Sequence, residues 1–335
     1  MQVLHVHIFR VEEGLGNACL LQFPDNSCGF VDWGTQGAGP LETALKIAEQ
    51  GRVRFVAASH AHADHTLGIE LLLRECMKRK IAIERFVYPA SSLHRENSHL
   101  TKARIAATDF GILTTDIKVD PFLTPKGRPD PPWLAFDKGW EVRVVSPSAT
   151  EISIEEMKAL KQKVVPGNPS SLVILFRFLN GTKSFGRVLL PGDATPETLE
   201  IARDTGRYFP ELEIDNDLFL IPHHGSHRNL PLWVEPHVQG IAAISSPTNK
   251  PKHPSAQTLK VLGAWVCNPK PPRLFCTSYA HACADAFGQN AKNKKLVEPG
   301  SCFGDITIEV SPTVAAYVKR ATANGDQRRP YGYCQ

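Results

Sequence analysis

The strongest constraint in this sequence is a stretch rich in histidine and aspartate, Ser59-His60-Ala61-His62-Ala63-Asp64-His65. Four side chains able to bind a metal fall within six residues, directly after the apolar run 53–58 and before a helix-like segment. Imidazole and carboxylate are the ligands that zinc and related divalent ions prefer. Because only 13 of the 335 residues are histidine, three of them at this spacing argue against a chance surface turn. The stretch predicts a metal site.

The composition is that of an ordinary globular protein able to bury a substantial core, with 42% hydrophobic and 21% charged residues. A formal charge of +4 does not indicate a nucleic-acid binder, although it leaves room for a local basic groove. The N-terminal residues lack the pattern of a signal peptide, and no run of 18 apolar residues occurs. Eight scattered cysteines without a Cys-x-x-Cys pair predict reduced thiols. We therefore expect a cytoplasmic protein without membrane contact.

Apolar runs separated by turn residues predict alternating strands and helices. Strands are expected at 3–9, 18–23, 28–31, 54–59, 83–88, 141–145, 171–179, 187–190, 218–221, 241–245, 273–276 and 306–310. Helices are expected at 41–50, 67–78, 196–204 and 256–262. The helix at 67–78 would present the apolar side chains Leu67, Leu71, Leu72 and Met77. The order of strand, metal loop, helix and strand predicts an α/β fold.

The chain is expected to form one domain over residues 1–318. Prolines and glycines gather among charges from residue 116 onward, which predicts an irregular insertion near 116–163. The strand-like runs resume their earlier style after it, so it does not mark a domain boundary. Residues 319–335 contain several basic side chains among small polar ones and are expected to form a flexible tail.

Three further clusters able to bind metal follow predicted strands. Asp193 follows the strand at 187–190, the pair His223 and His224 follows 218–221, and His253 follows 241–245 after a short connection. A single Gly-Asp is more often a turn, and the surroundings of His253 also suit a surface turn. Side chains at strand ends can nevertheless converge at one edge of a sheet. Their recurrence is therefore stronger evidence than any one of them.

These blocks resemble the metallo-β-lactamase-fold hydrolase superfamily. The similarity lies in His60-x-His62-x-Asp64-His65, in Asp32-x-Gly34 upstream and in Gly192-Asp193 downstream. Within the superfamily the sequence looks most like the metallo-β-lactamase domain of the DNA-uptake competence protein ComEC and its stand-alone relatives. That finer similarity lies in residues 14–18, 32–34, 168–173, 189–193, 222–226 and 249–254. The blocks together span nearly the whole chain.

The resemblance implies an αββα sandwich, four layers deep, with two divalent metal ions at one edge. Zinc is the expected metal, with manganese as the alternative. The implied ligands are His60 and His62 for the first ion, Asp64, His65 and one of His223 and His224 (with His224 preferred) for the second, and Asp193 as the bridge between them.

One segment departs from the superfamily pattern. The first ion normally has a third histidine ligand, from a Gly-His segment between the opening motif and the bridging aspartate. The matching residues here are Gly167-Asn168-Pro169-Ser170-Ser171, an absence that the ComEC-like group shares. We expect the first site to be short of ligands, with Asn168 or a water in the vacant position. The loop at Gly14–Asn17 also departs from the Gly-Gln-Gly-Asp of the relatives.

The expected reaction is hydrolysis by a hydroxide that bridges the two metals, since such ions lower the pKa of bound water from 15.7 toward about 7. Asp64 would act in catalysis by orienting this nucleophile or accepting its proton. Groups expected around the ligands, as supports or substrate contacts, are Ser59, Asp32, Ser226, Asn168, His253, Lys252, Lys250 and Arg228. The lysines and the arginine are more readily explained as solvated surface charges.

The preferred substrate class is a phosphodiester, in nucleic acid or in nucleotides. The alternative is a carboxylic ester, lactone, amide or thioester, because the sequence lacks a long basic surface studded with aromatic residues. A third reading is a binding protein whose metal site has degraded, as the missing histidine suggests. Retention of the other ligands argues against it. The sequence identifies no protein partner.

Overall fold

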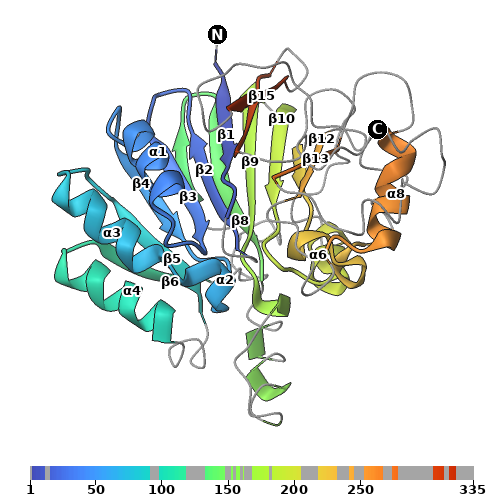
Figure 1. Cartoon of the computed structure of the whole chain (residues 1–335), viewed down its shortest axis with the longest axis horizontal. Helices are drawn as coiled ribbons and strands as arrows, with labels where there is room; N and C mark the ends of the chain where they lie inside the picture. The colour runs from blue at the N-terminus through green and yellow to red at the C-terminus, as the bar shows by residue number, and fades with distance from the viewer. Residues whose placement is uncertain are drawn as a thin grey trace.

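Two β-sheets lie face to face between outer layers of helices (Figure 1). This computed structural model describes residues 2–11, 16–90, 98–117, 133–147, 152–153, 156–158, 161, 168–180, 183–204, 218–231, 241–244, 253–266, 274–277, 305–312 and 317–321. No helix among these residues is long and apolar enough to cross a membrane.

The first sheet has the strand order β15-β14-β1-β2-β3-β4-β5-β6. Its strands are β1 (Leu4–Ile8), β2 (Ala18–Gln22), β3 (Cys28–Trp33), β4 (Val53–Ala57), β5 (Arg85–Pro89), β6 (Leu113–Ile117), β14 (Asp305–Val310) and β15 (Tyr317–Ala321). The run from β3 to β6 is parallel. Parallel neighbours need crossover connections, which are α1 (Ala38–Ala48), α2 (Ala63–Thr66) with α3 (Ile69–Lys78), and α4 (Ser98–Asp109).

The second sheet has the strand order β13-β12-β11-β10-β9-β8-β7. Its strands are β7 (Trp133–Asp137), β8 (Trp140–Ser146), β9 (Val173–Asn180), β10 (Lys183–Leu190), β11 (Leu218–Leu220), β12 (Ile241–Ile244) and β13 (Leu274–Cys276). The run from β10 to β13 is parallel. Helix α6 (Pro196–Asp204) follows β10, and α8 (Ala256–Val266) follows β12.

Two apolar cores define the layers. One lies between the sheets, where the ring of Phe23 stacks on that of Trp140 with their centroids 4.7 Å apart. The other joins the outer face of the first sheet to α1, α3 and α4, and includes Leu45 and Leu72. On the opposite side of the molecule, α6 and α8 lie outside the second sheet (Figure 1). The αββα arrangement expected from the sequence is confirmed.

The helix expected at 67–78 is present as α3 but begins two residues later, at Ile69. The N–H of Gly68 donates to the carbonyl of Trp33 at 2.8 Å, and a Cβ on Gly68 would come within 1.8 Å of the Thr35 carbonyl oxygen. This close approach separates α2 from α3. The buried face of α3 is consequently Ile69, Leu72, Leu73 and Cys76, which shares only Leu72 with the predicted apolar set.

Two predicted irregular segments contain strands. The range 116–163 includes β7, which was not predicted, and β8, which confirms the strand expected at 141–145 and lies between β7 and β9. Residues 118–132 fall outside the described residues. The tail predicted from residue 319 begins too early, because Lys319, Arg320 and Ala321 pair with β14 as part of β15. Residues 322–335 lie outside the described part. Helix α4 was not predicted.

The loops that carry the metal-binding motifs leave the carboxyl ends of parallel strands. The opening motif follows β4, Asp193 follows β10, and His223 and His224 follow β11. Because carboxyl ends of parallel strands lie at one edge of a sheet, the two sheets bring these loops together. The structure confirms that these strand ends converge, as expected from the sequence.

Gly34 is expected to be irreplaceable because of its position against the opening motif. A Cβ there would lie 1.7 Å from the Asp64 carbonyl oxygen, so Gly34→Ala must displace the loop. We expect a loss of about 1–3 kcal/mol in the free energy of unfolding, measured by urea denaturation. Gly39→Ala is the control, since nothing lies within 4 Å of its Cβ and it lies in α1. It should leave stability unchanged or raise it by up to about 1 kcal/mol. Equal stability of both variants would contradict the assigned contact.

Candidate metal centre

One short loop supplies four of the candidate ligands. After β4 the chain passes through His60 and His62 and then forms α2, a single turn that contains Asp64 and His65. The Thr66 hydroxyl donates to the His62 carbonyl at 2.9 Å, which closes the turn from within. The Asn17 N–H donates to the Asp64 carbonyl at 2.8 Å, which ties the turn to the first sheet. The loop is therefore held from both sides.

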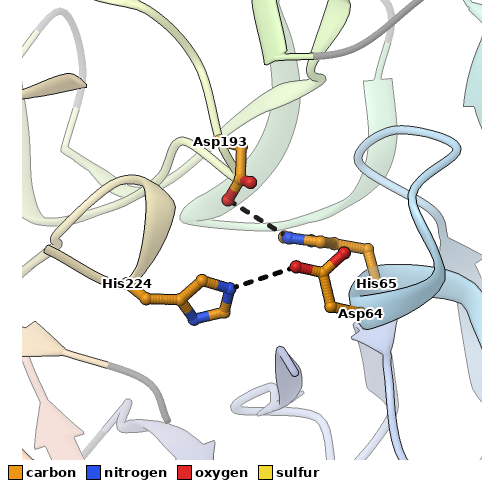
Figure 2. A group of neighbouring side chains, drawn as sticks. All are labelled: Asp64, His65, Asp193 and His224. Carbon is orange, nitrogen blue, oxygen red and sulfur yellow. Dashed lines mark ion pairs between the residues drawn. The ribbon is translucent and has the colours of Figure 1, made fainter. Parts of the chain in front are cut away.

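The candidate ligands form two groups that share Asp193. Asp64, His65, Asp193 and His224 each place a ligand atom within 4.8 Å of the others (Figure 2). His60, His62 and Asp193 form the second group by the same measure. These are the two sets that the resemblance implies, and His224 is the histidine of its pair that joins the Asp64 group.

The two carboxylate oxygens of Asp193 face different partners. Oδ1 lies 3.1 Å from Nε2 of His65, and Oδ2 lies 3.7 Å from Nε2 of His60. Across the first group, Nε2 of His224 lies 3.5 Å from Oδ2 of Asp64 (Figure 2). A carboxylate with one oxygen toward each group is placed to bridge two ions.

Asp32 and Ser59 fix the orientation of two imidazoles. The Ser59 N–H and hydroxyl donate to the Asp32 carboxylate at 2.6 and 2.8 Å, and Nδ1–H of His65 donates to the same carboxylate at 2.6 Å. Because the Ser59 hydroxyl proton is used on Asp32, its oxygen accepts from Nδ1–H of His60 at 3.1 Å. Both rings therefore direct Nε2 toward the site. Partners behind metal-binding histidines commonly act in this way.

Burial and charge set the protonation of the site. Burial, and then the neighbouring His65, hold the pKa of His60 well below its usual value, so its imidazole is neutral. Burial by itself would lower the pKa of His65, but the Asp193 and Asp32 carboxylates outweigh it and raise that pKa well above its usual value. Burial would likewise raise the pKa of Asp193, yet His65 and His60 hold it well below the usual range. Asp193 is therefore a buried anion.

The pKa values of His62 and Asp64, on the open side of the centre, are also set by burial and by neighbouring charged groups. Burial is the main cause of the lowered pKa of His62. For Asp64 burial opposes ionisation, but the contact with His224 and the charge of His65 outweigh it and keep its pKa below the usual range. At neutral pH the site thus offers ionised carboxylates and, at His60 and His62, neutral imidazoles, the protonation states in which both bind metals. His65 is protonated between the two carboxylates and would give up a proton when it binds a metal ion.

The donor set fits a divalent metal ion. Nε2 of His60, Nε2 of His65 and Oδ1 of Asp193 are buried and make no hydrogen bond. Buried polar atoms normally find a partner, because leaving one without a partner costs free energy. A cation between these atoms would satisfy all three. Imidazole with carboxylate suits zinc and its neighbours in the first transition series.

Backbone contacts between loops hold the two halves of the centre together. The Leu172 N–H donates to the Ser59 carbonyl at 2.7 Å, and the His223 N–H donates to the Gly192 carbonyl at 3.2 Å. Gly192 has a φ of 56° and lies so close that a Cβ would meet the Ser59 side chain at 2.8 Å. The loop after β10 therefore packs directly on the loop after β4.

The remaining predicted residues divide into those near the centre and those elsewhere. Asn168, in the short 3-10 turn Asn168–Ser170, places its amide 2.9 Å from Nδ1 of His223. The ring of His253 packs edge-on against that of His223, with centroids 5.1 Å apart. Ser226 is buried, and its backbone N–H donates to the His223 carbonyl at 2.9 Å. Arg228 is exposed, and Lys250 and Lys252 lie outside the described residues.

Sequence reasoning missed Asn229. Its side-chain N–H donates to the carbonyls of Asp193 and Ala194, and its side-chain oxygen lies 2.9 Å from Nδ1 of His223. Nothing in the sequence distinguishes it from any other polar loop residue. Its position close behind His223 and His224 is the only signal that could have drawn attention to it.

No family model and no curated protein matches the sequence. Among solved structures the chain is similar to a diphosphatase of the PhnP family, with 11% identity over 92% of this chain and 98% of that one and a TM-score of 0.44. It is also similar to the metallo-beta-lactamase fold protein YhfI from Bacillus subtilis, with 14% identity over 65% and 70% of the two chains and a TM-score of 0.32. A long form RNase Z from yeast gives 14% identity over 65% and 32% and a TM-score of 0.35. Similarity at this level gives no information about the substrate of this chain.

Asp32→Asn is expected to weaken metal binding without unfolding the chain. An amide that keeps its oxygen toward the Ser59 N–H must turn its NH₂ toward Nδ1 of His65. The His65 proton then moves to Nε2, which removes the lone pair that faces Asp193. We expect a drop of about 10–100-fold in affinity for one ion, measured by zinc titration against a chromogenic chelator.

Asp25→Asn is the matched control for this change. Asp25 precedes β3, whereas Asp32 lies near its other end, and Asp25 pairs with Arg54 instead of a histidine. Its replacement should leave both affinities at the wild-type values. An Asp32→Asn variant that titrates like Asp25→Asn would show that Asp32 has no part in orienting His65.

Proposed function

We propose that the chain is a metal-dependent hydrolase of the metallo-β-lactamase type, and that phosphodiesters are its substrates. The observation that carries the proposal is Asp193, a buried carboxylate with one oxygen directed to each of two ligand groups. Two ions held side by side stabilise both the attacking and the leaving oxygen of an in-line displacement at phosphorus. The two-group arrangement therefore favours phosphoryl chemistry.

The exposed side chains indicate where substrate would enter. His60, His65, Asp193 and His224 are fully buried, whereas the side chains of Asp64 and His223 are 24% and 27% exposed. His62 is also partly exposed. The open side of the centre is thus bounded by Asp64, His62 and His223, and we infer that the scissile group binds there.

The roles of the residues follow from their protonation and burial. Divalent ions bound here would activate water as a nucleophile and neutralise charge on the oxygens of the group under attack. Asp64 is ionised and borders the open side, so it can orient the attacking water. His65 and His60 are held rigidly by Asp32 and Ser59, so the centre does not need to reorganise during the reaction. The ComEC-like relationship, the choice of zinc, action on nucleic acid and a cytoplasmic location remain predictions from the sequence.

The proposal is tested with metal-stripped protein reloaded with Zn²⁺ or Mn²⁺. The substrates are bis(p-nitrophenyl) phosphate, DNA, RNA and cyclic nucleotides, beside p-nitrophenyl acetate and a lactone as carboxylic substrates. We expect phosphodiester turnover that a chelator abolishes and the metal restores. Turnover of the carboxylic substrates alone would favour that second class instead, and full metal loading with no turnover of any substrate would refute a hydrolase.

Asp193→Asn is expected to lower kcat/KM for the phosphodiester by roughly 10²–10³-fold, since it removes the charge shared by both ligand groups. Metal content per chain should fall in parallel, as measured by elemental analysis. Asp109→Asn is the control because Asp109 is exposed at the end of α4. An Asp193→Asn variant with wild-type turnover would place the reaction elsewhere.

A further inference from the structure

The His60–His62 group lacks one histidine of the superfamily pattern, and His223 lies beside this group. Nε2 of His223 is 3.7 Å from Oδ2 of Asp193. The same oxygen lies 3.7 Å from Nε2 of His60, while the other oxygen faces His65. His223 is therefore on the His60 side of the shared carboxylate, at the margin of the His60–His62 group.

Asn229 determines which nitrogen of His223 carries the proton. Its side-chain N–H groups donate to the carbonyls of Asp193 and Ala194 at 3.0 and 3.2 Å, so the amide orientation is fixed. Its oxygen consequently faces Nδ1 of His223 at 2.9 Å and accepts the proton from that nitrogen. The lone pair of His223 is then on Nε2, the atom that faces Asp193.

Asn168 contacts the same ring nitrogen. Its side-chain nitrogen lies 2.9 Å from Nδ1 of His223, so the Asn168 amide must rotate to present its oxygen to the proton that Asn229 places there. Asn168 belongs to the segment that supplies a histidine ligand in the superfamily pattern. Here the Asn168 side chain contacts Nδ1 of His223, while Nε2 of that ring faces Asp193. Asn168 is therefore placed to orient the imidazole.

The backbone turn separates the two adjacent histidines. His223 and His224 have φ values of 49° and 52°, and Gly225 has a φ of 87°. A left-handed conformation at two successive residues with a Cβ is unfavourable and is kept where surrounding structure enforces it. Here it points Nε2 of His224 toward Asp64 and Nε2 of His223 toward Asp193. The ring planes are 70° apart.

We propose that His223 is the third imidazole ligand of the His60–His62 ion, so that neighbouring histidines serve different ions. The proposal rests on the two-ion centre of the proposed function. Asn229 and Asn168 position the ring, and the vacant position in the sequence pattern is filled from the loop after β11. His223 is 27% exposed and lies at the margin of the His60–His62 group. The ion of that group is therefore the more weakly held and the more exchangeable of the two.

The test is metal binding without substrate. Equilibrium dialysis with Zn²⁺ and the absorption spectrum of Co²⁺-loaded protein are compared for wild type and His223→Asn, since asparagine tolerates positive φ. His227→Asn is the matched control, an exposed histidine in the following turn. We expect wild type and the control to bind two ions. His223→Asn should keep one ion at wild-type affinity and lose more than about 100-fold in affinity for the other, beyond the cost of losing a supporting group.

Pairs of variants identify which ion is lost. His62→Asn with His223→Asn should still retain one ion, because both changes affect the same shell. His224→Asn with His223→Asn should retain none at wild-type affinity. The proposal is overturned if His223→Asn binds both ions normally, if the His223–His224 double variant keeps one tight ion, or if wild type binds only one.

Further measurements distinguish the loss of a metal ligand from a loss of folding and from a loss of activity. Circular dichroism of the metal-free variants checks the fold, and Asn168→Ala gives a second test, with an expected loss of about 10-fold in affinity for the same ion. Unchanged affinities in Asn168→Ala, in a case where His223→Asn does not fold, would also overturn the proposal. Two bound ions with the expected His223 dependence but no hydrolysis would refute the proposed function and leave the role of His223 intact.

Discussion

A negative charge buried where the two sheets meet is the constraint on which the centre depends. Asp193 is 1% exposed and Asp32 is 2% exposed, and burying a carboxylate without compensation is costly. The loops supply the compensation as imidazoles, chiefly His65, which lies between the two carboxylates. A bound divalent cation would replace the positive charge that protonated His65 supplies and add to it. The histidine-rich loop after β4 is thus required by the aspartates as much as by the metal.

The arrangement of strands explains why the ligands can be so close. The parallel portions of both sheets direct their carboxyl ends to one edge, and backbone hydrogen bonds from Leu172 to Ser59 and from His223 to Gly192 lock the loops there. Glycines at the closest approaches, Gly34 and Gly192, leave no space for a side chain. The rigidity of the centre comes from these backbone contacts, with the side-chain contacts added to them.

Much of this could be predicted from the sequence because it depends on local pattern. Apolar runs located the described strands other than β6, β7 and β15. The resemblance to the superfamily implied the two ligand groups, which the structure brings together. The break between α2 and α3 could not be predicted, since it arises from Thr35 approaching Gly68. The pairing of Lys319–Ala321 likewise depends on β14, and local composition is misleading there.

The orientation of His223 could not be predicted for a different reason. Which way a histidine points after a strand depends on the φ of its own residue and on partners distant in sequence, here Asn168 and Asn229. The sequence pattern offers His223 and His224 as alternatives for one ligand position, with a preference for His224. The left-handed turn makes them two distinct groups, with different neighbours and different exposure.

The division of ligands between the sheets has a consequence for how the chain acquires its structure. Asp64 and His65 follow a strand of the first sheet, while Asp193 and His224 follow strands of the second, so neither sheet alone contains a complete set of donors. An ion that binds only the docked state stabilises it by RT ln(1 + [L]/Kd), about 2.7 kcal/mol at a hundred times Kd. Each ion bound there would therefore act as a reversible cross-link between the two sheets, so that the supply of metal would affect how cooperatively the sandwich holds together.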